Sequence, residues 1–202
     1  MKLIKFIWFV ALGGIVMGVI NSCEDKSVIA QHTDPPPVLP PVEVVKAPQW
    51  TCPDCNDAEK LVLKELQDKT NITDRNALAT ILGNIKQESN FRSNVCEGGH
   101  IVQYHNCNVG GYGLIQWTSP QRYDGLGSFC SKYKCDPSSL SGQVRYMINE
   151  KTFRIALPRF EQNRQTMQHY MSAAYRWLGW GIEGNRSLYS YQYTRRLVLD
   201  KV

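Results

Sequence analysis

The stretch ALATILGNIKQESNFR, residues 77–92, has the apolar spacing of an amphipathic α-helix. Ala77, Ile81 and Ile85 recur every four residues, which is close to the helical period. At about 100° per residue, Glu88 lies almost on the line of Ile81 and Ile85. The stretch therefore predicts a buried helix that carries one carboxyl group near the end of its apolar face.

A carboxyl group in this place allows two interpretations. Beside an apolar surface a carboxylate is costly to ionise, and a carboxyl that keeps its proton can act as a general acid near neutral pH. In the alternative, Glu88 reaches water at the end of the helix and has no chemical role. The periodicity of residues 77–92 does not decide between the two, so the evidence has to come from the rest of the chain.

The composition indicates one domain with appendages. The chain has 202 residues, 43% of them hydrophobic and 20% charged. The formal net charge is +5, and residues 1–49 hold four basic and four acidic residues, so the excess lies in residues 50–202. A basic domain suits an anionic polymer or surface. Because the chain has no long Lys/Arg run and no nucleic-acid-binding motif, we expect no nucleic acid partner.

Residues 1–22 resemble an export leader, with Lys2 and Lys5 ahead of an apolar run. The run ends in VINSC, which is similar to a bacterial lipobox and makes Cys23 a candidate for lipidation. The alternatives are an uncleaved membrane anchor and a buried N-terminal helix of a soluble protein. With a lipid or an anchor, the rest of the chain is exported and membrane-tethered, on the periplasmic side or at the cell surface.

A Pro-rich linker follows the leader. The segment PPPVLPPVEVVKAP at 35–48 favours extended polyproline II over helix. We therefore divide the chain into a leader or anchor (1–22), a linker (23–49) and a folded domain (50–202).

Six of the seven cysteines fall as close pairs within the folded domain. In an oxidising compartment this spacing suggests three local disulfides, although sequence alone leaves the connectivity open. The pairs are Cys52–Cys55, Cys96–Cys107 and Cys130–Cys135. The alternatives are a redox-active CxxC at 52–55 and a zinc site, whose ligands would be Cys96, His100, His105 and Cys107.

Helices are expected over most of the domain. Asn56 and Glu59 form a capping box for a helix over 57–69, and Thr73 or Asp74 caps a helix over 74–89. The Gly- and Asn-rich segment 93–112 predicts a small β-hairpin closed by Cys96–Cys107. Further helices are expected near 119–134, 138–150, 161–178 and 188–200.

The chain has an acid at a helix end, followed by a stapled hairpin, a Gly-rich turn and Gln116-Trp117. This order is typical of a site that cleaves sugars. Glycoside cleavage needs an acid that protonates the leaving oxygen, and usually a second carboxylate or a participating group of the substrate. Glu97 in the hairpin is a better candidate for the second carboxylate than Asp124. In the alternative, Glu97 is only a solvated charge of the hairpin.

The segments GNIKQESNF (83–91) and GGYGLIQWTSPQR (110–122) are similar to the phage tail lysozyme family. This family belongs to the lysozyme-like superfamily and is related to goose-type lysozymes and soluble lytic transglycosylases. The superfamily shares an acid-Ser pair at a helix end and a Gly-Leu-x-Gln turn, which here are Glu88-Ser89 and residues 113–116. The likeness continues through QVRYMINE (143–150) and spans about residues 70–200.

The resemblance implies a mainly α (α+β lysozyme-like) fold, with the stapled hairpin beside the active-site cleft. It implies Glu88 as catalytic acid in a peptidoglycan glycosidase that cleaves the bond between N-acetylmuramic acid (MurNAc) and N-acetylglucosamine (GlcNAc) without a cofactor. A hydrolase with a second carboxylate and a lytic transglycosylase with a single acid both remain open. The residues expected to bind or position the substrate are Ser89, Tyr112, Gly113, Gln116, Trp117 and Arg122, whereas Trp177 and Trp180 are expected in the core.

These implications fit a phage-encoded enzyme for cell-wall penetration or lysis. Its partners would be peptidoglycan, the membrane through the N-terminal segment, and other virion proteins. The main alternative is a non-catalytic virion or envelope protein that binds cell wall through a lysozyme fold. A zinc or cysteine peptidase is a third interpretation, against which the paired cysteines argue.

Overall fold

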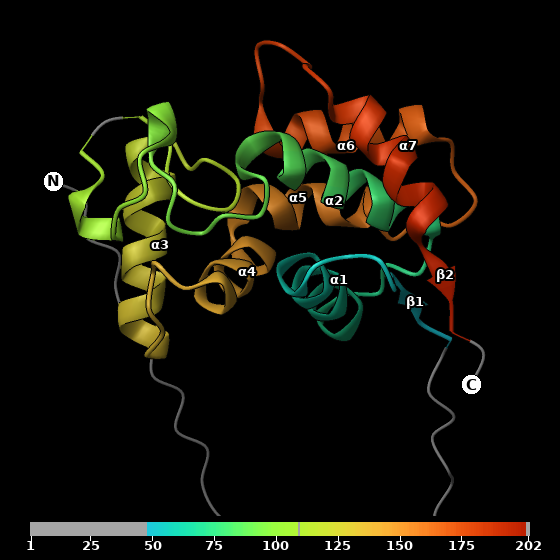
Figure 1. Cartoon of the computed structure of the whole chain (residues 1–202), viewed down its shortest axis with the longest axis horizontal. Helices are drawn as coiled ribbons and strands as arrows, with labels where there is room; N and C mark the ends of the chain where they lie inside the picture. Colours follow the sequence, from blue (N-terminus) through green and yellow to red (C-terminus); the bar gives the residue numbers. More distant parts are fainter. Residues whose placement is uncertain (1–47, 109, 201–202) are drawn as a thin grey trace, which may run out of the picture. The chain divides into compact units, whose positions relative to one another are not determined.

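The computed structural model describes residues 48–108 and 110–200. In the described part, the chain runs from one short strand through seven α-helices to a second short strand, which lies beside the first (Figure 1). The mainly α fold predicted from the sequence is confirmed. No helix among the described residues is both long and apolar enough to cross a membrane. The predicted leader, Cys23 and the linker up to residue 47 lie outside the described residues.

The helices follow the predicted ones closely in the first half of the domain and less closely in the second. Their bounds are α1 Asp57–Lys69, α2 Arg75–Ser89, α3 Pro120–Tyr133, α4 Leu140–Asn149, α5 Lys151–Phe160, α6 Met167–Leu178 and α7 Arg186–Arg196. Helix α5 was not predicted from the sequence. It contains Pro158, and proline disfavours helix interiors. The buried side chains of Phe153, Leu157 and Phe160 favour the helix nevertheless.

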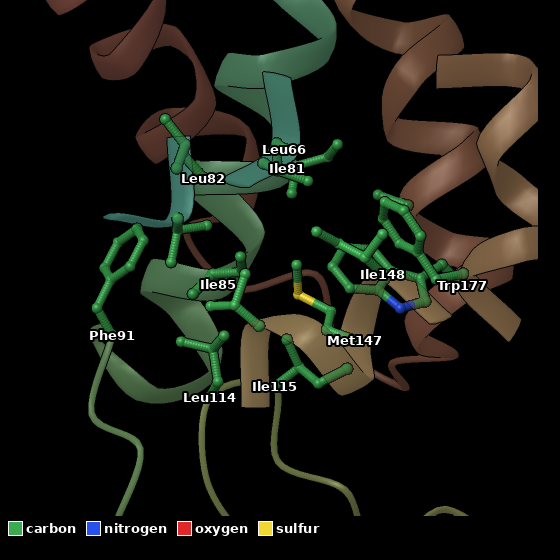
Figure 2. Close-up of a cluster of buried hydrophobic side chains, with 14 of the residues drawn as sticks. Leu66, Ile81, Leu82, Ile85, Phe91, Leu114, Ile115, Met147, Ile148 and Trp177 are labelled. Atoms are coloured by element: carbon green, nitrogen blue, oxygen red, sulfur yellow. The ribbon is translucent and has the colours of Figure 1, made fainter. Parts of the chain in front are cut away.

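Helix α2 occupies the centre of the domain and packs against α1, α6 and α7 (Figure 1). Its apolar face is fully buried at Ile81 and Ile85. Figure 2 shows Leu114 and Ile115, from the turn after the stapled segment, in the same cluster of side chains as Ile85 and Met147. The core therefore extends past the end of α2 and includes the turn that the resemblance singled out.

Helix α1 begins with the predicted capping box. The Asn56 side chain accepts a hydrogen bond from the Glu59 N–H at 2.9 Å, and the Glu59 carboxylate accepts one from the Asn56 N–H at 2.8 Å. Glu59 also accepts hydrogen bonds from the Tyr193 hydroxyl and the Arg196 guanidinium. The start of α1 is thereby joined to the last turns of α7.

The predicted hairpin over 93–112 is not formed as such. Isolated antiparallel bridges pair Val95 with Ile101 and Cys96 with Tyr112, and two short 3-10 helices, η1 Glu97–Gly99 and η2 Tyr104–Asn106, stand where the strands were expected. Gly98 and Gly99 both have positive φ, 81° and 86°, which turns the chain within η1 and prevents an extended strand. The segment is nevertheless stapled as predicted.

All three predicted disulfides are present: Cys52–Cys55, Cys96–Cys107 and Cys130–Cys135. Because Cys96 and Cys107 are bonded to each other, they offer no thiolates to a zinc ion, and the same holds for the CxxC pair. The disulfides thus hold loops and helix ends in a domain with little sheet.

The two strands join the ends of the domain. Strand β1 Trp50–Thr51 pairs antiparallel with β2 Val198–Leu199, with Trp50 opposite Leu199. The helix predicted to reach residue 200 accordingly ends at Arg196, and the last residues pair with the start of the domain.

Candidate active site

Glu88 lies in the last turn of α2, as predicted. The Asp74 side chain caps the start of this helix by accepting hydrogen bonds from Asn76 N–H at 2.8 Å and Ala77 N–H at 3.3 Å. At the other end, the Glu88 side chain is 15% exposed and accepts a hydrogen bond from the Arg186 guanidinium. The Glu88 side chain is therefore mostly covered but still partly exposed.

The chain turns sharply after Glu88 through two residues in the left-handed region. Asn90 has φ 52° and Phe91 has φ 62°, a conformation that bulky residues rarely adopt. Phe91 is only 4% exposed and packs edge-on against Tyr193, with ring centroids 6.1 Å apart. Burial of this ring compensates for the backbone strain and fixes the direction in which the stapled segment leaves the acid.

Ser89 links the acid-bearing helix to the Gly-Leu-Ile-Gln turn. Its buried hydroxyl donates to the Leu114 carbonyl at 2.7 Å, and the Leu114 N–H donates to the Gln143 side chain, also at 2.7 Å. Gln143 is fully buried and donates in turn to the Ser93 and Pro137 carbonyls. The Ser89 hydroxyl is thus used inside the protein, where it joins the end of α2 to the turn.

Gly113 and Gln116 shape the same turn. Gly113 has φ 72°, and a Cβ there would lie 2.4 Å from the Gln143 Oε1, so the glycine makes room for a side chain of the protein. The Gln116 amide donates to the Gly113 carbonyl at 2.9 Å and to the Val95 carbonyl at 3.3 Å. Gln116 therefore braces the turn against the stapled segment while remaining partly exposed.

Arg186, which the sequence did not indicate as a site residue, is the charged neighbour of Glu88. It begins α7 and is 6% exposed, and it also donates to the Ile182 carbonyl at 3.0 Å and the Glu183 carbonyl at 2.8 Å. Its guanidinium lies over the Trp180 ring, 4.7 Å from the centroid. The positive charge is thus held in place by carbonyls, an aromatic face and the acid.

The Gly-Asn pair that precedes the acid explains how Arg186 arrives there. A Cβ on Gly83 would lie 2.4 Å from the Ser190 backbone nitrogen, so α2 and α7 touch at this glycine. Arg186 stands four residues before Ser190 on α7, and Glu88 stands five residues after Gly83 on α2. The close crossing of α2 and α7 therefore brings the two charged side chains together. The sequence shows Gly83 but does not show which helix packs against it.

Two predicted substrate contacts lie inside the protein, and a third is held in an ion pair. Tyr112 and Trp117 are both 0% exposed, so neither ring has surface to offer a sugar. The Tyr112 hydroxyl donates to the Val102 carbonyl at 3.2 Å. Arg122 forms a two-pronged ion pair with Glu150, at 3.1 and 2.7 Å, and so already has a carboxylate partner. The burial of Tyr112 and Trp117 therefore contradicts the expected sugar contact for these two residues, whereas the partly exposed Arg122 keeps its predicted role as an expectation.

Glu150 gathers four donors in the core. Besides the two hydrogen bonds from Arg122, its carboxylate accepts one from the Trp117 indole at 3.1 Å and one from the Trp177 indole at 3.0 Å. The side chain is 2% exposed. The predicted core position of Trp177 is confirmed, and this saturated carboxylate joins α3, α6 and the start of α5.

Glu97, the candidate second carboxylate, is exposed on η1. Its carboxylate accepts a hydrogen bond from the Gly111 N–H at 2.9 Å, and Gly110 packs directly against it. The carboxylate is therefore fixed to the glycines just ahead of the Gly113–Gln116 turn. A surface hollow of about 690 Å³, by contrast, lies at the opposite end of α2 and is lined by none of the predicted site residues.

The domain is mainly helical, and its central helix α2 ends with a partly covered glutamate. The serine that follows this glutamate is hydrogen-bonded to a Gly-Leu-x-Gln turn. This arrangement is a lysozyme-like architecture. Residues 58–180 match the family model for phage tail lysozyme, and the protein belongs to this family. Membership indicates a lysozyme-like function with peptidoglycan as substrate. Comparisons with curated proteins and with solved structures gave no match.

Proposed function

We propose that the protein is a muramidase that cleaves the MurNAc–GlcNAc bond of peptidoglycan with Glu88 as general acid. The observation that carries the proposal is the position of Glu88: it ends the buried helix α2, and the next residue is bonded to the Gly-Leu-Ile-Gln turn. In a glycosidase, such an acid gives its proton to the glycosidic oxygen as the bond to the sugar breaks.

Arg186 gives this acid a particular constraint. The Arg186 guanidinium is hydrogen-bonded to the Glu88 carboxylate, and both side chains are mostly buried. The proton donor of the proposed reaction therefore has a fixed positive neighbour, which can stay bound to it when the proton has moved to the glycosidic oxygen. We therefore assign Arg186 the role of a positioning residue that stabilises the carboxylate left after proton transfer.

Two routes follow from the same first step. In hydrolysis, a water molecule attacks the anomeric carbon, and Glu97 is the proposed carboxylate that takes its proton. In transglycosylation, the C6 hydroxyl of the same MurNAc attacks, its proton returns to Glu88, and a 1,6-anhydro end is formed. The second route needs one acid only, and Glu97 has no part in it.

The experiment compares the purified full chain with its Glu88→Gln variant on intact peptidoglycan. We expect the variant to release fragments about 10²–10⁴-fold more slowly, the usual loss when a general acid is removed. Equal cleavage by both proteins would exclude Glu88 as the acid. Binding of peptidoglycan without cleavage by the unmodified chain would favour the non-catalytic cell-wall-binding protein.

Mass spectrometry of the fragments and a Glu97→Gln variant separate the routes. Reducing ends together with slow cleavage by Glu97→Gln indicate the hydrolase, whereas 1,6-anhydro ends and unchanged cleavage by Glu97→Gln indicate the transglycosylase. Either result decides between hydrolysis and transglycosylation.

The biological setting proposed is cell-wall penetration or lysis by a phage. Family membership supports it, and the leader-like residues 1–22 would place the domain outside the cytoplasm, with a lipid on Cys23 or a retained anchor as tether. The mass of the mature N-terminus tests the tether, because lipidated Cys23 and retained Met1 give different masses.

A further inference from the structure

The connection between α6 and α7 places an aromatic pair beside the candidate acid. Trp180 is half-buried and Tyr175 is 55% exposed, and their rings meet edge to face with centroids 5.2 Å apart. Trp180 contacts the Arg186 guanidinium, which in turn contacts Glu88. Figure 1 shows this connection at the same end of the domain as the last turn of α2. An unbroken series of contacts thus leads from an exposed aromatic side chain to the acid.

The connection is held firmly against α2. The Asn185 N–H donates to the Gln87 side chain at 2.9 Å, and Gly184 packs against the same side chain. Arg186 donates to two carbonyls of the connection as well as to Glu88. The aromatic pair therefore has a fixed position relative to Glu88, as a binding surface requires.

The backbone around Trp180 is uncrowded. Gly179 and Gly181 flank it, and a Cβ added to either glycine would meet no atom within 4 Å. Arg186 lies over the Trp180 ring, and the exposed Tyr175 ring beside it offers an aromatic surface to the apolar face of a pyranose ring, whose hydroxyls can reach the polar groups nearby. The acidic and basic groups that a bound sugar would approach here are Glu88, Glu183 and Arg186.

We propose that Tyr175 and Trp180 form a sugar-binding subsite for the glycan strand of peptidoglycan, joined to Glu88 through Arg186. The proposal rests on the muramidase function in that the same glycan strand reaches the acid. Trp180, which was expected in the core, is half-buried and packs against the core from its edge. The proposal also assigns sugar contact to aromatic residues outside the Gly-Leu-Ile-Gln turn, where Trp117 has no exposed surface.

The test measures binding in the full chain carrying Glu88→Gln, so that cleavage does not disturb the measurement. The probe is soluble glycan strands from peptidoglycan whose stem peptides have been removed. We expect Tyr175→Ala to weaken binding by about three- to tenfold, the loss of one aromatic contact, and Trp180→Ala to weaken it further. Tyr191→Ala is the matched control, because Tyr191 is also 55% exposed, on α7; it should bind as the parent does.

Trp180→Phe tests whether a loss at Trp180 is only structural. It keeps an aromatic face and should restore part of the binding that Trp180→Ala loses. Unchanged binding by Tyr175→Ala and Trp180→Ala, equal losses in Tyr175→Ala and Tyr191→Ala, or absence of binding by the parent would each overturn the subsite. Failure of the proposed function has a separate signature, since Glu88→Gln would then cleave like the unmodified chain whatever the binding results.

Discussion

Two Arg–Glu pairs of this protein have the same chemistry and different surroundings. Glu150 is 2% exposed and accepts four hydrogen bonds, from Arg122, Trp117 and Trp177. Glu88 is 15% exposed, and Arg186 is its hydrogen-bond donor. The first carboxylate has its acceptor capacity filled by the protein, whereas the second keeps capacity for a proton or a substrate.

The difference separates a carboxylate that holds the fold together from one that is available for a reaction. A carboxylate that receives two hydrogen bonds on each oxygen joins the elements that supply the donors. A carboxylate with one hydrogen-bonding partner and some exposure has acceptor sites left for another molecule. In this chain the first kind lies between α4 and α5, and the second at the end of α2.

The largest expected effect is a loss of stability on breaking the Arg122–Glu150 pair. Glu150→Gln leaves the mostly buried Arg122 without a countercharge, and we expect it to lower the free energy of unfolding by about 3–5 kcal/mol. Glu88→Gln should lower it by only about 1–2 kcal/mol, because Arg186 keeps two carbonyl acceptors and the Trp180 face. Denaturant unfolding of the two variants measures both values. Equal losses would remove the distinction between the pairs.

The second prediction concerns the helix crossing that creates the Glu88–Arg186 pair. Gly83→Ala pushes a methyl group into the Ser190 backbone, so we expect a loss of about 1–3 kcal/mol in unfolding free energy and slower cleavage as Arg186 moves from Glu88. Gly181→Ala is the control for stability, since its Cβ would lie in open space. A Gly83→Ala variant as stable as Gly181→Ala would show that α2 and α7 can separate without cost.

The third prediction concerns the bond from the acid helix to the turn. Ser89→Ala leaves the buried Leu114 carbonyl without its donor, which should cost about 1–3 kcal/mol of stability. Because Leu114 belongs to the turn beside the acid, we also expect a lower rate of cleavage. Thermal unfolding and fragment release measure the two effects. An unaffected rate would mean that the turn keeps its place without Ser89.

The sequence predicts the parts of this site that depend on local spacing. Helix α2, its acid, the turn and the disulfide pairs follow from periodicity, motifs and close cysteines. Sequence alone does not show that Trp117 is fully buried and Trp180 only half-buried, because burial depends on which residues pack around each ring. Arg186 was missed for a similar reason: it lies 98 residues after Glu88, and only the close crossing at Gly83 brings it near.

The smallest expected effect concerns Glu59, a second carboxylate that accepts several hydrogen bonds. Burial by itself raises the pKa of Glu59, but hydrogen bonds from Tyr193, Arg196 and the Asn56 N–H outweigh it and hold the pKa below its ordinary value of 4.5. A carboxyl with a lowered pKa in the folded state stabilises the fold above its unfolded pKa. This stabilisation is present at neutral pH and is lost as the pH falls below about 4.5 and through the folded-state pKa. Unfolding free energies of the unmodified chain and of Glu59→Gln, measured from neutral pH down to about pH 3, should therefore converge in this range. A constant difference between the two proteins would mean that Glu59 stabilises the fold by packing and not by its charge.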